Sequence, residues 1–218
     1  MRIPIHREGW RFIAIFAAIN AALYWLTPWA ALGFAPLTIW CIAFFRDPER
    51  TPPPGDLRIV SPADGKLLPI VEAVPPEELG MGPQPRRRLS IFMDVFNVHV
   101  NRMPVSGTVI ALAYRPGRFF NASFDKASVH NERMSARVRP AGSNDPERDI
   151  AVVQIAGLVA RRIVCDIEEG DAVQRGARYG MIRFGSRLDV YLPSSAKIVV
   201  QDSSVTRAGE TVLAELQG

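Results

Sequence analysis

Hydrophobic and polar positions divide the chain into an apolar N-terminal stretch and a longer part in which apolar and polar residues alternate. No charged residue occurs from Phe12 to Phe45. As one helix this stretch would be roughly 50 Å long, against ~30 Å for the hydrocarbon core of a bilayer. Two prolines, Pro28 and Pro36, interrupt it, so the pattern predicts two short spans or a re-entrant hairpin. The two segments are Phe12–Leu26 and Trp29–Phe45, within a membrane-anchoring segment formed by residues 1–45.

Basic residues flank the apolar stretch on both sides: Arg2, Arg7 and Arg11 before it, Arg46 and Arg50 after it. Positive charge on both flanks favours a hairpin with both ends in the cytoplasm over a single crossing. Trp25 and Trp29 flank the turn, as interface anchors often do. We therefore expect a protein of the cell inner membrane with its main domain on the cytoplasmic side. The alternative is a buried pair of core helices in a soluble protein.

Residues 46–56 are rich in proline and charge, which predicts a stiff, extended linker. From residue 57 to residue 218 the pattern consists mostly of short alternating or apolar runs separated by turn residues, for example Leu188–Leu192. No amphipathic run of helical period reaches a good length. We therefore predict a mainly β (α+β) domain, a β-rich barrel or sandwich, preceded by the hydrophobic helical hairpin.

Glycine turns recur in the C-terminal half, at Glu169-Gly170-Asp171, Arg175-Gly176-Ala177 and Ala208-Gly209-Glu210. The spacing Gly-Asp-x-Val-x-x-Gly is typical of the swapped-hairpin sandwiches of lipoyl and biotinyl domains. No lysine in a Met-Lys context stands at a hairpin tip, so the hairpins are lipoyl-like but a carrier domain is disfavoured.

Charge and cysteine content narrow the range of partners. The formal net charge is +4 and the isoelectric point is about 9.4, with Arg86–Arg88 the only basic triplet. Such a mild excess fits an anionic membrane surface better than nucleic acid, which we do not expect as a partner. The two cysteines, Cys41 and Cys165, provide neither metal-ligand spacing nor a disulfide framework. They fit a reducing compartment, and we expect no metal.

The residues with the clearest chemical potential are a glycine–serine pair and a histidine. Gly185-Ser186 precedes an alternating run, and a strained Gly185 carbonyl would be open to attack by the Ser186 hydroxyl, which would cut the chain. A plain glycine bend is the alternative. In an alternating strand His99 would share one face with Asn97 and Asn101. His99 then suits general acid or base catalysis, or it is a satisfied structural histidine.

Two further polar residues have weaker signals. Asp64 lies in the turn Ser61–Gly65 before a strand, where it either caps the turn or orients a histidine as the third member of a relay. His130 lies in a polar stretch and is interpreted as a loop residue. The sequence has no Gly-rich phosphate loop, no Gly-x-Ser-x-Gly elbow and no His-Glu-x-x-His motif. With these motifs absent, the enzyme classes that remain as candidates are those that make their own electrophile.

Five short motifs occur in order along the chain: Phe44–Arg50, Ser61–Gly65, Asn97–Pro104, Asn131–Arg133 and Phe184–Ser186. Together they resemble the phosphatidylserine decarboxylase proenzyme family, specifically its short bacterial form. The resemblance covers nearly the whole chain from the membrane segment onward.

The resemblance implies a self-processing, pyruvoyl-dependent lyase of phospholipid biosynthesis. An Asp64–His99–Ser186 relay would drive attack of Ser186 on the Gly185 carbonyl, and β-elimination from the resulting ester would separate a β chain (1–185) from an α chain (186–218). The two chains would stay associated. Loss of ammonia would leave a covalent pyruvoyl group, derived from Ser186, as the cofactor. The substrate implied is phosphatidylserine in the membrane, and the products are phosphatidylethanolamine and CO2.

This chain departs from the longer family members, which carry a second histidine directly before Met-Pro, where Arg102 stands here. The sequence therefore leaves open whether His99 serves self-cleavage, turnover or both, and whether His130 supplies a missing function. Candidate partners of the lipid phosphate are Arg86–Arg88, or Arg115 with Arg118.

Two other functions remain open at the level of sequence. A non-enzymatic, membrane-tethered β-sandwich adaptor would explain the anchor and the hairpins, but not the order of Asp64, His99 and Ser186. A pyruvoyl decarboxylase acting on a related serine phospholipid, such as archaetidylserine, would share all of these features.

Overall fold

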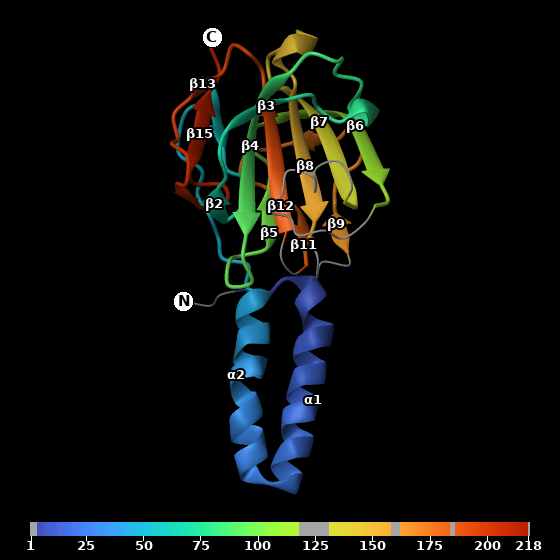
Figure 1. The fold of residues 1–218 in the computed structure, drawn as a ribbon, viewed down its shortest axis with the longest axis vertical. Helices are drawn as coiled ribbons and strands as arrows, with labels where there is room; N and C mark the ends of the chain where they lie inside the picture. Colours follow the sequence, from blue (N-terminus) through green and yellow to red (C-terminus); the bar gives the residue numbers. More distant parts are fainter. Residues whose placement is uncertain (1–3, 118–130, 158–161, 184–185, 218) are drawn as a thin grey trace.

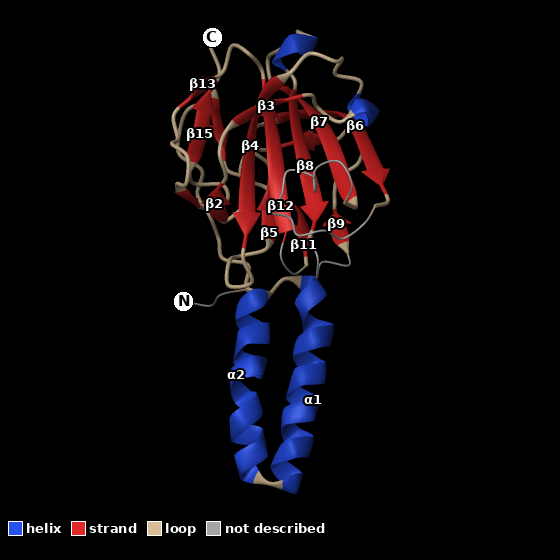
Figure 2. Cartoon of the chain, viewed as in Figure 1, coloured by secondary structure: helices blue, strands red, loops and turns tan. Residues whose placement is uncertain are grey.

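In the computed structural model, which describes residues 4–117, 131–157, 162–183 and 186–217, a helical hairpin projects from one end of a β-rich domain (Figures 1 and 2). Helix α1 (Trp10–Leu26) follows the short 3-10 turn η1 (Arg7–Gly9), and helix α2 (Pro28–Phe44) returns beside α1 to the domain. The β-rich α+β fold and its N-terminal helix pair confirm the fold class predicted from the sequence.

The hairpin turns at Thr27, whose extended backbone (φ −164°, ψ 133°) separates the two helices. Pro28 takes the first position of α2, where a backbone N–H would have no acceptor within the helix, so proline is tolerated there. Pro36 lies inside α2 without ending it, so the expectation that Pro36 interrupts the segment was wrong. Packing against α1 keeps the helix continuous there, and Asn20 of α1 donates to the Thr38 Oγ1 atom of α2 at 3.3 Å.

The described strands form three antiparallel sheets. Their bounds are β1 (Arg58–Val60), β2 (Gly65–Leu67), β3 (Val71–Ala73), β4 (Arg86–Met93), β5 (Val100–Arg102), β6 (Gly107–Arg115), β7 (Arg133–Pro140), β8 (Ile150–Ala156), β9 (Ile163–Cys165), β10 (Ala172–Val173), β11 (Arg178–Ile182), β12 (Ser186–Leu192), β13 (Lys197–Ile198), β14 (Val205–Thr206) and β15 (Val212–Glu215). Two 3-10 turns, η2 (Glu77–Leu79) and η3 (Pro146–Arg148), lie in the connections.

The largest sheet has nine strands in the order β10-β6-β7-β8-β12-β4-β2-β14, with β3 also pairing with β4. The two smaller sheets have the orders β1-β15-β13 and β5-β11-β9. Residues of all three sheets meet in one apolar core, and the described strands close no barrel. Of the two architectures left open by the sequence, the layered one is present.

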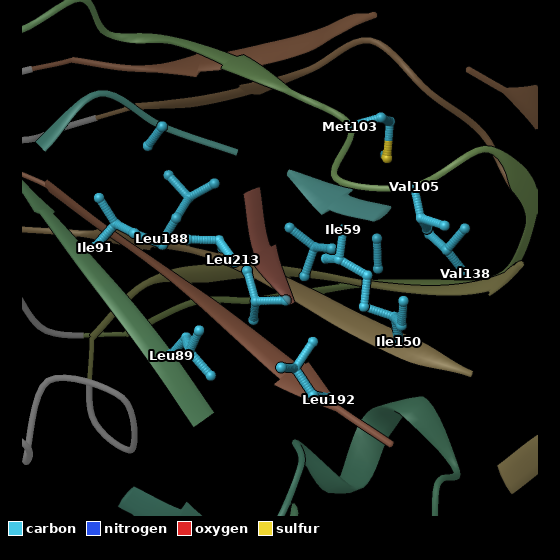
Figure 3. Close-up of a cluster of buried hydrophobic side chains, with 14 of the residues drawn as sticks. Ile59, Leu89, Ile91, Met103, Val105, Val138, Ile150, Leu188, Leu192 and Leu213 are labelled. Carbon is cyan, nitrogen blue, oxygen red and sulfur yellow. The ribbon is translucent and has the colours of Figure 1, made fainter. Parts of the chain in front are cut away.

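The main core lies on one face of the nine-stranded sheet (Figure 3). Leu188, Val190 and Leu192 of β12 point into it together with Leu89 and Ile91 of β4. Burying each such side chain contributes about 1.5–3 kcal/mol. The intervening residues of β12 face the other side, as the two-residue period of a strand requires.

That other face of β12 carries a buried ion pair. Arg187 donates to the two carboxylate oxygens of Asp189 at 2.6 and 2.8 Å, and both side chains are almost fully buried. A second apolar cluster, which includes Leu79, Met81 and Tyr191, covers this face. Strand β12 is therefore enclosed on both faces, and β4 and β8 pair with its two edges.

The segment after α2 is bound to the domain by ion pairs. Asp47 contacts Arg178 (2.7 Å), and Arg50, whose side chain is 9% exposed, contacts Asp64 and Glu210. The linker has no helix or strand of its own, but these contacts fix its course along the β domain.

The three predicted glycine turns are present, because Gly170, Gly176 and Gly209 all have positive φ. At Gly176 (φ +79°) a Cβ atom would also lie 2.2 Å from the Pro52 Cγ atom. Glycine is therefore required there both by the backbone conformation and by the close approach of the linker.

The base of the hairpin packs firmly on the β domain. Phe44 and Phe45 are buried against Val164 and Met181, which lie on β9 and β11. A Cβ atom at Gly9 would lie 2.5 Å from Phe45, so the start of α1 also approaches this contact closely. The orientation of the hairpin relative to the sheets is set by this cluster.

Candidate active site

Ser186 is the first residue of β12 and lies deep in the large sheet. It is opposite Met93 of β4 on one side and Ala156 of β8 on the other. Its side chain is fully buried on the core face, and its Oγ atom has no hydrogen-bond partner among the described residues. A buried, unsatisfied hydroxyl costs about 1–3 kcal/mol and calls for a functional explanation. Gly185, the predicted site of attack, lies outside the described residues.

The end of the sheet that holds Ser186 faces the hairpin. In Figure 1 the arrowheads of β4 and β8 point toward the helices, so these strands end at Met93 and Ala156 on that side. Ser186 is the register partner of both residues and starts the antiparallel strand between them. The candidate nucleophile therefore lies at the end of the domain next to the apolar helices.

His99 lies immediately before β5 and is fully buried. Its Nδ1 atom is 3.0 Å from the carbonyl oxygen of Asn97, and its ring packs against Phe44 of α2 at an interplanar angle of 32°, with centroids 4.1 Å apart. Burial lowers the pKa of His99 to about 4. Because a carbonyl can only accept, Nδ1 carries the proton, and Nε2 keeps a lone pair that has no partner among the described residues. His99 is thus a neutral imidazole at pH 7, suited to act as a base at Nε2.

The predicted strand face of Asn97, His99 and Asn101 is only partly present. Asn97 belongs to a turn before the strand, and its side-chain oxygen accepts a hydrogen bond from the Asp94 N–H at 2.9 Å. This local bond holds Asn97 in the turn, as asparagine side chains often do. Only Asn101 lies within β5.

Asp64 is buried in the turn that precedes β2 and is held by two donors. Its Oδ1 atom accepts from the Ala208 N–H at 2.7 Å, and its Oδ2 atom accepts from Arg50 at 2.9 Å. The next residue, Gly65, approaches β4 so closely that a Cβ atom would lie 2.2 Å from the Phe92 oxygen. Asp64 therefore lies beside the same end of β4 as Ser186, on the opposite side of that strand. No hydrogen bond joins Asp64 to His99 or Ser186 within the described ranges.

Three amides lie near Ser186, and one of them, Gln154, was not singled out from the sequence. Gln154 of β8 donates to the Asn101 Oδ1 atom at 2.8 Å, and its own Oε1 atom is buried without a partner in the described part of the chain. Asn131 donates to the Ala156 oxygen at 2.7 Å, directly beside Ser186. Gln154 could have been found as the one amide in the apolar run Ile150–Ala156. These amides make the interior near Ser186 polar enough to bind a carbonyl or an amine.

Arg102, which stands where longer family members have a second histidine, has a structural role. It donates to the Gly176 oxygen at 2.7 Å and to the Pro48 oxygen at 2.9 Å, and it lies 3.6 Å from Asp47. Arg102 therefore ties the linker to a glycine turn of the domain. His130, the other candidate for the missing function, lies outside the described residues.

The fold places the arginines considered as partners of the lipid phosphate in different positions and at different degrees of burial. Arg86 and Arg88 are buried, and Arg86 donates to the Glu147 and Asp149 carbonyls. They lie toward the end of β4 farthest from Met93. Arg115 is exposed at the end of β6, and Arg118 lies outside the described residues. Arg87 is half-buried and donates to the Ser194 and Ala196 carbonyls, so Arg115 is the most accessible of the candidates that the structure describes.

The described residues contain no group of three or more His, Cys, Asp or Glu side chains that could hold a metal ion. The Ser186 hydroxyl, the Gln154 Oε1 atom and the His99 Nε2 atom are each buried without a partner among the described residues, and such polar atoms fit a small covalent group at Ser186. The arrangement combines a buried hydroxyl, a neutral imidazole and amide groups at the end of a sheet next to apolar helices. These groups fit an enzyme that makes its own electrophile, the class that the sequence leaves open.

Comparison with known proteins agrees with this class. The family profile described as phosphatidylserine decarboxylase matches residues 37–214. Proteins named phosphatidylserine decarboxylase proenzyme are 57% identical over 98% of this chain in Cereibacter sphaeroides, 55% over 98% in Ruegeria pomeroyi and 53% over 98% in Paramagnetospirillum magneticum. The alignments cover 90%, 96% and 87% of these relatives. The chain belongs to the phosphatidylserine decarboxylase family. It is therefore a decarboxylating enzyme, and a non-enzymatic adaptor is not favoured.

Proposed function

We propose that this chain cuts itself between Gly185 and Ser186 and then, anchored in the membrane, converts phosphatidylserine to phosphatidylethanolamine and CO2. Its membership of the family supports the substrate, and the word proenzyme in the names of its relatives supports the processing. The observation that carries the proposal is the buried Ser186 hydroxyl, which has no hydrogen-bond partner among the described residues.

In the proposed self-cleavage, Ser186 Oγ attacks the Gly185 carbonyl as His99 accepts the hydroxyl proton at Nε2. The Asn97 carbonyl supports this role because it holds the proton of His99 on Nδ1. The peptide C–N bond breaks, an ester forms, and the freed nitrogen of Ser186 takes a proton. A base then removes the Ser186 α-proton, and β-elimination releases the Gly185 carboxylate. The resemblance implies Asp64 as the third member of this relay, but here its carboxylate binds Arg50 and the Ala208 N–H instead of His99.

The elimination leaves dehydroalanine at residue 186, and its hydrolysis by one water, with loss of ammonia, would leave a pyruvoyl with Gln154 and Asn101 beside it. When present, this group supplies a ketone that condenses with the substrate amine and accepts the electron pair released as CO2 leaves. The protein supplies the rest. The closed interior around Ser186 excludes water, the Gln154 Oε1 atom offers an acceptor to an amine N–H, and His99 holds or returns a proton at Nε2. His99 would thus serve both self-cleavage and turnover.

We propose that the two chains remain associated after the cut. Strand β12 belongs to the fragment 186–218, yet it pairs along its length with β4 and β8 of the fragment 1–185. Its core face is also buried among residues of the larger fragment. Separation would expose both faces and break both ladders.

The proposed location is the inner membrane, with the β domain on its cytoplasmic side. One helix, Arg7–Leu26, is long and apolar enough to cross a bilayer, and the second, Pro28–Phe44, is shorter. Most apolar side chains of the pair are exposed, including Trp25 at 89% and Trp29 at 79%. Basic residues at both ends favour a cytoplasmic domain. The substrate headgroup would then lie next to the end of the sheet that holds Ser186.

Intact-mass spectrometry of the detergent-purified protein tests the proposal. We expect two fragments, residues 1–185 and 186–218, with the second lighter by one ammonia than the same peptide beginning with serine. Ser186→Ala should give one uncut chain without decarboxylase activity, because no hydroxyl remains to attack. Ser90→Ala is the matched control, since the Ser90 Oγ atom is also buried without a partner among the described residues but lies on the opposite face of the sheet from Ser186. A Ser186→Ala protein that still releases CO2 from phosphatidylserine would refute the mechanism. Ether-linked substrates in the same assay distinguish related serine phospholipids.

A further inference from the structure

A turn at the hairpin end of the domain projects two apolar side chains outward. The turn Asp94–Asn97 joins β4 to β5, and Figure 1 shows it next to the domain end of α2. Val95 is 37% exposed and Phe96 is 70% exposed. Among the described residues outside the two helices, Phe96 is the most exposed aromatic side chain. An aromatic residue so exposed at this place needs a partner.

Three of the four backbone N–H groups of this turn are satisfied within the turn itself. The Asp94 side chain accepts from the Phe96 N–H at 2.7 Å, and the Asn97 side chain accepts from the Asp94 N–H at 2.9 Å. The Asn97 N–H in turn donates to the Asp94 oxygen at 3.2 Å. The turn is therefore rigid, and these donors do not depend on water.

The two carbonyls at the tip are bound by the base of the hairpin. Trp40 donates through Nε1 to the Val95 oxygen at 3.2 Å, and Arg46 donates to the Phe96 oxygen at 2.7 Å. Tryptophan and arginine are residue types that favour the interface between membrane and water. These bonds fix the tip at the height where the hairpin leaves the domain. A backbone with its polar groups satisfied in this way can enter a poorly hydrated layer at low cost.

We propose that Val95 and Phe96 insert into the lipid headgroup layer beside the hairpin and form a second membrane contact of this protein. The occupant is the bilayer and not another protein, because the tip continues the apolar surface of α1 and α2 and is bound to α2 through Trp40. This inference rests on the membrane anchoring proposed above.

The contact has a consequence for the active site. The turn follows directly on Met93, the register partner of Ser186, and leads within two residues to His99. The depth of the tip in the lipid therefore sets the distance between the headgroup layer and the reacting residue. The hairpin alone would let the domain tilt, whereas two contacts hold the open end of the sheet against the membrane.

A depth measurement tests the inference. Phe96→Cys and Val74→Cys are each introduced into the full chain in a background where Cys41 and Cys165 are replaced by alanine, labelled with an environment-sensitive fluorophore and reconstituted into phosphatidylglycerol–phosphatidylcholine nanodiscs. Val74 is the control because it is 50% exposed and follows β3 beside Arg86, at the far end of the eight-residue strand β4. That strand is about 27 Å long.

We expect lipids with a nitroxide near the headgroup to quench the label at position 96 at least about twofold more than the label at position 74, because interfacial groups lie ~5–10 Å into the boundary. Equal quenching at the two positions overturns the inference. A denaturing gel of the same samples reports self-cleavage separately, so an uncut chain would count against the proposed function and not against the membrane contact.

If a cysteine variant fails to fold, the unmodified protein still decides the question. Photoactivatable lipids should label a proteolytic peptide that contains Phe96. Labelling confined to peptides of the two helices would refute the insertion.

Discussion

The burial of His99 leads to a quantitative prediction for the pH dependence of self-cleavage. Desolvation lowers the pKa of His99 to about 4 from its usual 6.5. A base with a pKa of 4 is still about 90% neutral at pH 5, whereas a base with a pKa of 6.5 is about 3% neutral, a ~30-fold difference in the reactive form. We therefore expect the cleavage rate to be nearly constant from pH 7.5 to pH 5 and to fall as the pH drops through 4.

The perturbation that tests the cause is Phe44→Ala. The Phe44 ring covers the imidazole at 4.1 Å, so its removal admits water and raises the pKa of His99 toward 6.5. The rate at pH 5 should then fall by up to ~30-fold relative to the rate at pH 7.5. Phe45→Ala is the matched control, because Phe45 is equally buried but stacks on Phe12 at 5.4 Å.

The assay follows uncut chain after a pH step. Protein synthesised without cells into nanodiscs is shifted to each pH, stopped at intervals and separated on a denaturing gel, so the rate refers to one turnover of the chain on itself. A wild-type rate that drops ~10-fold between pH 7.5 and pH 5 would refute the reasoning, since the imidazole would then be solvated. Identical pH profiles for Phe44→Ala and Phe45→Ala would refute the role of the Phe44 ring in lowering the pKa of His99.

Two further predictions concern stability. Asp189→Asn should lower the free energy of unfolding by about 3–5 kcal/mol, because it removes the buried carboxylate paired with Arg187, whereas Glu215→Gln at an exposed ion pair should cost less than about 1 kcal/mol. Urea unfolding in detergent measures both, and similar losses would argue against the buried pair. Gly176→Ala should lower the midpoint of thermal unfolding more than Gly142→Ala, since both have positive φ but only Gly176 meets Pro52. Equal shifts of the midpoint would mean that the linker contact adds nothing.

The features that could be predicted from the sequence are those set by local pattern. The charge-free run gave the hairpin, with Pro28 at its turn, because an uncharged stretch of that length has few other stable structures. The alternation in Leu188–Leu192 gave a strand with one core face. The glycines at 170, 176 and 209 marked turns because positive φ excludes most other residues.

The features that could not be predicted depend on contacts between distant parts of the chain. Arg50 binds Asp64 only because the linker folds back on the domain, and a linker rich in proline has no local signal for this. The burial of His99 depends on Phe44, which comes from a helix that the sequence assigns to the membrane. Asn97 was misplaced because a side-chain bond to Asp94 outweighs strand alternation over so short a segment.

Because β12 is a central strand of the largest sheet, the proposed self-cleavage depends on completed folding of the domain. Ser186 acquires its neighbours from β4 and β8 only once the middle of the largest sheet has been assembled. In the proposed scheme a copy that stalls before that step keeps an ordinary peptide bond and stays inert. In this scheme no separate inhibitor or protease is needed to keep incompletely folded copies of the enzyme inactive.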